Sequence, residues 1–153
     1  MSTKPAPSDH HDALTQLPNR RLLDDRLTQA LHLAQRRDSG VALALVELLS
    51  FSRVHDAMVD EAARRLARVV RKADTLARWS AGQFAIVMTD VRAEAQCHPL
   101  LERLVATLGM EVAIGVSLFP SDAGDAEALG RNATAALDRA RQQGRERICF
   151  YAR

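Results

Sequence analysis

The sequence has few cysteines and no long apolar run. Its 2 cysteines, Cys97 and Cys149, lie far apart and fit no metal-binding spacing, so we expect reduced thiols in a cytoplasmic protein. The longest uninterrupted apolar run covers residues 41–46, whereas a transmembrane helix needs about 18 or more apolar residues. A charged-then-apolar leader with a small-residue cleavage site is also lacking. We therefore expect neither secretion nor a membrane partner.

A basic stripe interleaved with aromatic residues is lacking too, and the sequence has no nucleic-acid-binding motif. We therefore expect no nucleic-acid partner. The net charge is +2, and arginine supplies nearly all of the positive charge. Because the arginine fork can bind phosphate in a bidentate manner, such a surface could suit a nucleotide. An ordinary solvated, arginine-rich surface is the simpler interpretation.

What the chain does contain is the composition and patterning of one globular domain. Of its 153 residues, 47% are hydrophobic and 26% are charged. Residues 1–11 lack a periodic apolar pattern, and we expect a flexible tail there, followed by one domain over residues 12–153. Apolar periodicity predicts helices over residues 20–37, 50–57, 60–72, 93–108 and 126–143, and strands over residues 41–48, 75–79, 84–88, 110–119 and 148–151.

The order of these elements predicts the fold class. The segment Ser80-Ala81-Gly82-Gln83 joins two short strands and is typical of a β-hairpin turn. Helices interleaved with a central hairpin predict an α/β (α+β) domain, in which helices flank both faces of a central mixed five-stranded sheet. We expect Gly144 to end the last helix in the left-handed conformation.

Four segments, in order along the chain, resemble the GGDEF family of bacterial cyclic di-GMP signalling. They begin at Asp12 (DALTQLPNRR), Ala73 (ADTLARW), Ala113 (AIGVSLFP) and Ala136 (ALDRARQQGR). They are similar to the family's D-x-L-T-x-L-P-N-R opening, to the stretch that leads into its signature, to its late S-I-G-I strand and to its closing A-L-Y-x-A-K-x-x-G-R helix. The resemblance implies the palm-like fold of nucleotidyl cyclases. Active members are diguanylate cyclases, in which two facing domains each hold one GTP and carboxylates hold Mg²⁺.

The signature that names the family is degenerate in this chain. A Gln83 amide brings no charge to a divalent cation, and Gly82 removes a second carboxylate. Side chains also stand at the first two positions, where bare backbone normally approaches the nucleotide. The resemblance therefore implies a catalytically inactive domain without catalytic residues, bound metal or cofactor. The five G-G-D-E-F positions hold Ser80, Ala81, Gly82, Gln83 and Phe84.

Other positions that the resemblance assigns to the metal and the nucleotide are only partly retained. Glu47 lies in the first metal-ligand segment, where it could bind a metal or could simply end a buried strand. Asp56 remains from the guanine-recognition pair, but the loop after it is shortened. Arg141 keeps the positive charge of a phosphate-contacting lysine position. We interpret these residues as vestigial nucleotide and metal positions, and we expect no Mg²⁺ to bind.

One functional pattern of the family is intact. Arg71-Lys72-Ala73-Asp74 fits the R-x-x-D of the inhibitory product-binding site. The resemblance implies that Arg71 contacts a guanine or a phosphate of cyclic di-GMP and that Asp74 accepts from a guanine edge. A third contact could come from Arg78, Arg68 or another nearby arginine. Alternatively, Arg71 only complements the dipole at a helix end, and Asp74 only begins a strand.

These features leave three functional hypotheses. The first is a cyclic di-GMP receptor that uses Arg71 and Asp74. The second is a protein-interaction scaffold that pairs with itself as a homodimer, or with a GGDEF or other signalling protein. The third is an unorthodox nucleotide enzyme, which would include residual cyclase activity.

Overall fold

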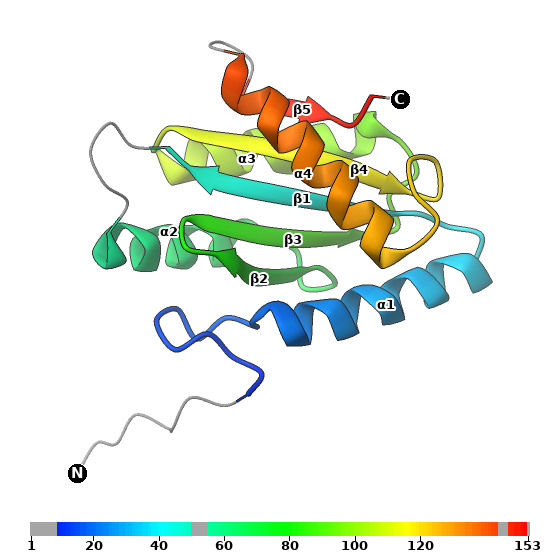
Figure 1. Ribbon diagram of the computed structural model, residues 1–153, viewed down its shortest axis with the longest axis horizontal. Helices are drawn as coiled ribbons and strands as arrows, with labels where there is room; N and C mark the ends of the chain where they lie inside the picture. The colour runs from blue at the N-terminus through cyan, green and yellow to red at the C-terminus, as the bar shows by residue number, and fades with distance from the viewer. Residues whose placement is uncertain (1–8, 50–54, 144–146, 153) are drawn as a thin grey trace.

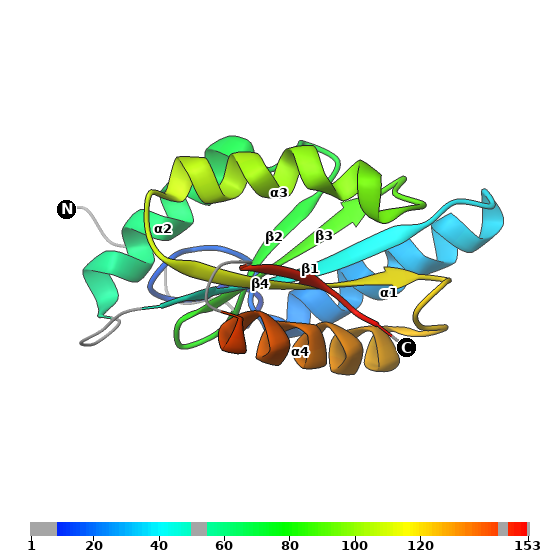
Figure 2. The ribbon, with the colours of Figure 1, turned by 90° about the horizontal axis from the view of Figure 1, so that it is seen from above.

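The computed structural model of the chain describes residues 9–49, 55–143 and 147–152. In these ranges a central five-stranded sheet lies between two layers of helices (Figures 1 and 2). This arrangement confirms the predicted α+β fold with a mixed sheet, a hairpin and helices on both faces. The elements are α1 (Arg20–Arg36), β1 (Val41–Leu48), α2 (Asp56–Val69), β2 (Thr75–Ser80), β3 (Gln83–Thr89), α3 (Glu94–Leu108), β4 (Val112–Phe119), α4 (Ala126–Gln142) and β5 (Ile148–Phe150).

The strand order of the sheet is β2-β3-β1-β4-β5. β1 pairs antiparallel with both β3 and β4, β2 and β3 form the antiparallel hairpin, and β5 joins β4 in parallel. Because both faces of the sheet are covered, β1 is apolar almost throughout and its residues 41–46 are buried. The register places Glu47, near the end of β1, opposite Gln83 at the start of β3.

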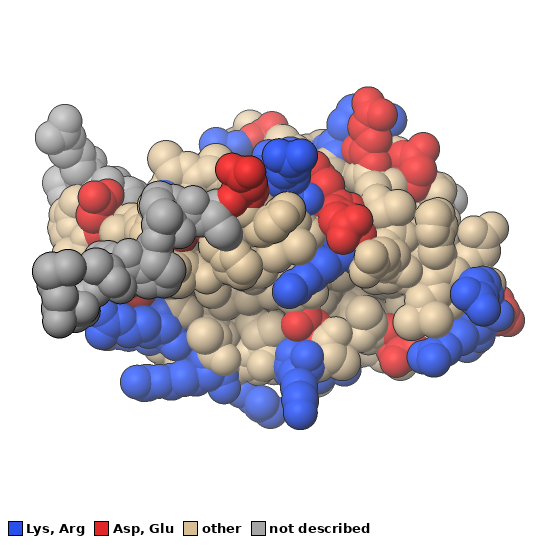
Figure 3. All heavy atoms as spheres, turned by 90° about the horizontal axis from the view of Figure 1, so that it is seen from below, with Lys and Arg blue, Asp and Glu red and all other residues tan. Residues whose placement is uncertain are grey.

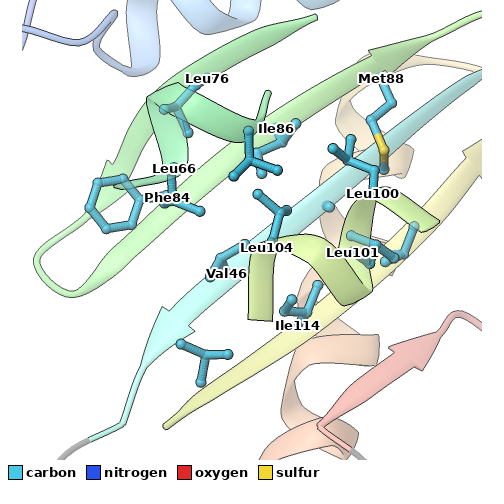
Figure 4. Packing of buried hydrophobic residues seen from close by; sticks show 14 of the residues in the cluster. Val46, Leu66, Leu76, Phe84, Ile86, Met88, Leu100, Leu101, Leu104 and Ile114 are labelled. Atoms are coloured by element: carbon cyan, nitrogen blue, oxygen red, sulfur yellow. The ribbon is translucent and has the colours of Figure 1, made fainter. Parts of the chain in front are cut away.

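Side chains that alternate along the strands feed two separate hydrophobic layers. On the face covered by α2 and α3, Val46 and Phe84 pack with apolar residues of both helices, including Leu66 and Leu101 (Figure 4). On the opposite face, the apolar stripes of α1 and α4 pack over the intervening strand positions. This second layer includes Leu23, Leu27 and Leu31 of α1, Leu43 and Leu45 of β1, and Leu129, Ala133 and Leu137 of α4.

The segment between β1 and β2 differs from the sequence prediction. Helices were predicted over residues 50–57 and 60–72, but one helix, α2, covers Asp56–Val69. Residues 50–54 lie outside the described ranges. The helix ends earlier than predicted because Val70 is extended and a turn follows, in which the Asp74 amide donates to the Arg71 carbonyl. The predicted cap Gly144 also lies outside the described residues.

The residues just before α1 are fixed to one another by backbone contacts. His11 pairs with Pro18 as an isolated bridge, the Asn19 amide donates to the His10 carbonyl, and the Asn19 side chain donates to the Asp9 carbonyl. Residues 9–11, which the sequence assigns to a flexible tail, therefore lie against the start of the domain. Asn19 also caps α1 by accepting from the Leu22 amide. None of the helices in the described ranges combines the length and the apolar content of a membrane span.

Candidate functional site

The segment Ser80-Ala81-Gly82-Gln83-Phe84 forms the tip of the β2–β3 hairpin. Ser80 is the last residue of β2 and Gln83 is the first residue of β3, so Ala81 and Gly82 make the turn. Phe84 is fully buried and packs beside Leu66 (Figure 4). The retained phenylalanine thus anchors the hairpin to the core under α2 and α3, and the four positions before it present their groups at the hairpin end.

The polar side chains of the hairpin are turned toward β1. The Ser80 hydroxyl donates to Oε1 of Gln83 at 2.5 Å, and Nε2 of Gln83 donates to Oε1 of Glu47 at 2.5 Å. Because the hydroxyl occupies the amide oxygen, the amide nitrogen is left to face the carboxylate. The Glu47 side chain is only 16% exposed. The structure thus brings together Ser80, Gln83 and Glu47, which the sequence assigns to the signature and to the first metal-ligand segment.

Arg141 reaches the same carboxylate from the last turn of α4. Its Nε lies 3.4 Å from Oε2 of Glu47, and its guanidinium also contacts Oδ1 of Asp138, one turn earlier on the helix. Glu47 therefore has an amide donor at one oxygen and a guanidinium at the other. Within the part of the chain that the structure describes, no three His, Cys, Asp or Glu side chains are grouped so that they could hold a metal ion.

Asp56, which the sequence assigns to the guanine-recognition pair, is not part of this network. It is the exposed first residue of α2, where its charge complements the positive end of the helix dipole. The network around Glu47 is built from β1, the β2–β3 hairpin and α4. Among the contacts of the described residues, none joins Asp56 to Glu47, Gln83 or Arg141.

The R-x-x-D motif forms a closed pair at the start of β2. Nε and one terminal nitrogen of Arg71 donate to the two oxygens of Asp74 at 2.7 and 3.0 Å, and the same terminal nitrogen donates to the Thr89 carbonyl at 2.9 Å. Asp74 also accepts from the Thr89 amide at 3.1 Å. The Asp74 side chain is 0% exposed, whereas that of Arg71 is 50% exposed. The hydrogen bond to Asp74 raises the pKa of Arg71.

Arg78 lies at the other end of β2, away from Arg71 and Asp74. Its NH1 lies 3.0 Å from Oδ2 of Asp12, and its remaining nitrogens donate to the carbonyls of Ser80 and Ala81 at 2.9 and 2.8 Å. The structure thus places Arg78 with the hairpin turn and not at the R-x-x-D motif, where it was expected. Proximity in sequence was misleading because the length of β2 separates the two groups.

A different arginine accompanies Arg71. Arg103 of α3 lines a cavity of about 180 Å³ together with Arg71, Gln96 and the apolar side chains of Met88, Val91, Pro99 and Leu100. Sequence reasoning missed Arg103 because it comes from a helix that follows the hairpin. Only the folding of α3 over β3 brings it to this cavity.

Asp12 was also missed as a site residue, although it opens the motif that carries the family resemblance. Besides its ion pair with Arg78, Asp12 accepts from the backbone amide and the hydroxyl of Thr15 at 2.9 and 2.8 Å. Burial acts to raise the pKa of Asp12, but the hydrogen bonds from Thr15 and the charge of Arg78 outweigh it and lower the pKa below its usual value. Asp12 thus ties the N-terminal segment to the hairpin turn.

The two cysteines lie outside the Glu47 network, although the charge of Arg71 acts on Cys97. Cys97 and Cys149 are both buried and form no disulfide. Burial, together with the charge of Glu94, raises the pKa of Cys97 to about 11. A thiol with so high a pKa carries little thiolate near neutral pH, which makes it a poor nucleophile and a poor metal ligand.

Comparison with known families agrees with the motifs. The family model described as "Diguanylate cyclase, GGDEF domain" matches residues 9–147. The bifunctional diguanylate cyclase/cyclic di-GMP phosphodiesterase MucR of Pseudomonas aeruginosa is 36% identical over 160 residues, covering 92% of this chain and 23% of MucR. The cyclic di-GMP phosphodiesterase NbdA of the same organism is 29% identical over 162 residues, covering 94% of this chain and 21% of NbdA. The chain thus spans less than a quarter of either relative.

Solved structures show the same fold. The GGDEF domain of TpbB from Pseudomonas aeruginosa superposes with a TM-score of 0.87 at 24% sequence identity, covering 94% of this chain and 95% of that one. A sensory box/GGDEF family protein from Caulobacter crescentus superposes with a TM-score of 0.81 at 32% identity, covering 88% of this chain and 99% of that one. The palm-like arrangement of the sheet and its helices is therefore shared.

Proposed function

This chain belongs to the GGDEF domain family of diguanylate cyclases, and we propose that it acts in cyclic di-GMP signalling without synthesising the dinucleotide. The proposal rests on the groups that contact the Glu47 carboxylate. Gln83 donates to one of its oxygens, and the guanidinium of Arg141 lies beside the other. The groups that face Glu47 are thus donors and a cation, with no second carboxylate from the hairpin.

The chemistry of the reaction explains why this matters. Phosphoryl transfer from GTP depends on divalent cations that neutralise the triphosphate, and such cations are held by carboxylates. At the hairpin Gln83 is neutral, and Ser80 and Ala81 carry side chains beside the turn. Loss of metal-ion catalysis alone costs orders of magnitude in rate. We therefore expect purified chain incubated with GTP and Mg²⁺ to form no cyclic di-GMP; measurable product would refute the proposal.

A second function, binding of cyclic di-GMP at the R-x-x-D motif, is favoured by the exposure of Arg71. Half of the Arg71 side chain is exposed, and the cavity it lines also receives Arg103. Arg68 and Lys72, which flank the motif, are exposed too. Two guanidinium groups at one cavity suit a phosphate diester. Because Asp74 is buried, its part in this proposal is to hold the guanidinium of Arg71 in place.

Proteins with this fold have been solved in complex with a dinucleotide and in complex with a protein. The GGDEF domain of DgcB from Caulobacter crescentus has been solved in complex with c-di-GMP, and it is 23% identical to this chain. The diguanylate cyclase SiaD of Pseudomonas aeruginosa has been solved in complex with its activator SiaC, and it is 28% identical. A dinucleotide and a protein partner are therefore the two alternatives for this chain.

Calorimetric titration with cyclic di-GMP separates these alternatives. We expect micromolar binding that weakens about tenfold or more in Arg71→Ala and in Arg103→Ala, because each variant loses charge-assisted hydrogen bonds to phosphate. Arg139→Ala, an exposed position on α4, is the matched control and keeps wild-type affinity. Absence of heat with the wild-type chain would reject the receptor function and favour a protein partner.

A further inference from the structure

Beside Glu47, which the resemblance places in the metal-ligand segment, lies the guanidinium cation of Arg141. Glu47 is 16% exposed, and its Oε2 lies 3.4 Å from Nε of Arg141. We propose that Arg141 is a built-in substitute for the divalent cation, and that it locks the degenerate site in a closed, metal-free state. This inference rests on the proposed loss of synthesis, for which it supplies a physical cause beyond the missing acid at Gln83.

The position of Arg141 on α4 fits this role. It lies in the last turn of the helix, where a cation also complements the negative end of the helix dipole. Asp138, one turn earlier, contacts the same guanidinium. The guanidinium is therefore held between a carboxylate of its own helix and the carboxylate of β1. The Arg141 side chain is 39% exposed and that of Glu47 is 16% exposed, so the contact is partly shielded from solvent.

The substitutions in the hairpin complete the lock. Nε2 of Gln83 donates to Oε1 of Glu47 at 2.5 Å. A carboxylate in place of the Gln83 amide would instead repel the Glu47 carboxylate at that separation. The Ser80 hydroxyl donates to the amide oxygen of Gln83 and so directs the amide nitrogen toward Glu47. Ser80, Gln83 and Arg141 thus act as one set around Glu47: Gln83 donates to it, Ser80 orients Gln83, and Nε of Arg141 lies beside it while NH2 of Arg141 contacts Asp138.

The set predicts how metal affinity responds to mutation. Gln83→Glu alone restores a second carboxylate, but Arg141 can pair with it and keep the site closed. Gln83→Glu combined with Arg141→Ala leaves two adjacent carboxylates without the internal cation. We therefore expect the double variant to bind Mn²⁺ at least about tenfold more tightly than Gln83→Glu, whereas the wild type and Arg141→Ala bind it weakly.

Electron paramagnetic resonance of free Mn²⁺ measures these affinities directly, with the intact chain and Mn²⁺ as the only ligand. Arg139→Ala in the Gln83→Glu background is the matched control, since it removes an exposed arginine from the same part of α4. The proposal is overturned if Gln83→Glu alone binds Mn²⁺ as tightly as the double variant, or if the control raises the affinity equally.

A second measurement keeps the proposal testable if the double variant does not fold. The urea midpoints of the wild type, Glu47→Gln, Arg141→Gln and their combination form a double-mutant cycle. We expect the combined shift to be smaller than the sum of the single shifts, because both variants break the same contact. Additive shifts would overturn the proposal. Cyclic di-GMP production by the wild type would instead refute the loss of synthesis, so the two failures are distinguishable.

Discussion

Asp12 is the residue on which the N-terminal segment and the hairpin turn converge. It accepts from Thr15 twice and pairs with Arg78, which in turn holds the carbonyls of Ser80 and Ala81. We expect Asp12→Asn to lower the free energy of unfolding by about 1 kcal/mol near neutral pH, because charge-assisted bonds become neutral ones in a partly solvated site. Urea unfolding of both chains measures the difference.

The pH dependence of this difference follows from the lowered pKa of Asp12. A carboxyl whose pKa is lowered by folding stabilises the folded state fully above its unfolded value of about 3.9, and the stabilisation is lost as pH falls through the folded pKa. The gap between wild type and Asp12→Asn should therefore be constant from pH 7 to pH 5 and shrink at pH 3. A gap that widens toward pH 3 would contradict the assignment.

Asp74 is a buried carboxylate, and its removal should be more costly. It receives two bonds from Arg71 and one from the Thr89 amide, with a side chain that is 0% exposed. We expect Asp74→Ala to lower the free energy of unfolding by about 2 kcal/mol, since the Thr89 amide and the half-exposed guanidinium of Arg71 lose their acceptor. Glu102→Ala, which removes an exposed acid from α3, is the control, with an expected change below about 0.5 kcal/mol. A small effect at Asp74 would mean that the pair is not structural.

At the residue scale, the sequence was sufficient to find the positions that depart from the family motifs and insufficient to find their partners. Gln83, Glu47 and Arg141 could each be located by resemblance to family motifs. The pairing between them depends on strand register and on how α4 crosses the sheet, which no local pattern specifies. For the same reason Arg78 was grouped with Arg71 by its proximity in sequence, whereas the structure pairs it with Asp12.

At the scale of elements, the backbones of β4 and α4 approach each other closely at Gly115. A Cβ atom built at Gly115 would lie 2.1 Å from the Leu137 amide nitrogen and 2.5 Å from the Ala133 carbonyl oxygen, both of them backbone atoms. Gly115→Ala therefore forces the strand and the helix apart. We expect it to lower the free energy of unfolding by about 3 kcal/mol, as measured by urea unfolding.

Gly130 on α4 supplies the matched control for this prediction. A Cβ atom built there would meet only the Trp79 ring, at 3.6 Å, which is an ordinary van der Waals contact. Because alanine is the better helix former by up to about 1 kcal/mol, Gly130→Ala should leave stability unchanged or raise it. Equal destabilisation by both variants would contradict the close-packing account of Gly115.

The pattern of apolar residues predicted most elements. Helix α1 buries only one face and gives a helical repeat, whereas β1 is buried almost throughout and gives a continuous apolar run. The pattern was misleading between β1 and β2, where the helix predicted over residues 60–72 covers Asp56–Val69; the helix predicted over residues 50–57 lies largely outside the described residues. The apolar pattern continues past Val69 to Val70, but the backbone turns there so that Arg71 and Asp74 can reach Thr89. Tertiary hydrogen bonds, rather than local propensity, therefore set this helix end.

At the scale of the whole molecule, the chain shares the GGDEF fold but differs from the family signature at the tip of the β2–β3 hairpin. The fold matches that of the TpbB GGDEF domain with a TM-score of 0.87. The hairpin, β1 and α4 contribute Gln83, Glu47 and Arg141 to one network, in which Gln83 and Arg141 contact the Glu47 carboxylate. Acidic and basic side chains are interspersed over the face shown in Figure 3, and basic side chains gather along one margin. Such a surface suits an anionic ligand or a protein partner.

The central claim is that this molecule does not synthesise cyclic di-GMP, and a product assay tests it most directly. Wild type and Gln83→Glu are incubated with GTP and either Mg²⁺ or Mn²⁺, at chain concentrations high enough for two domains to meet, with the diguanylate cyclase TpbB as positive control. Nucleotides are separated by chromatography and identified by mass. We predict no cyclic di-GMP from either chain, because Gln83→Glu leaves Arg141 beside Glu47. Multiple turnovers of GTP to cyclic di-GMP by the wild type would contradict the account.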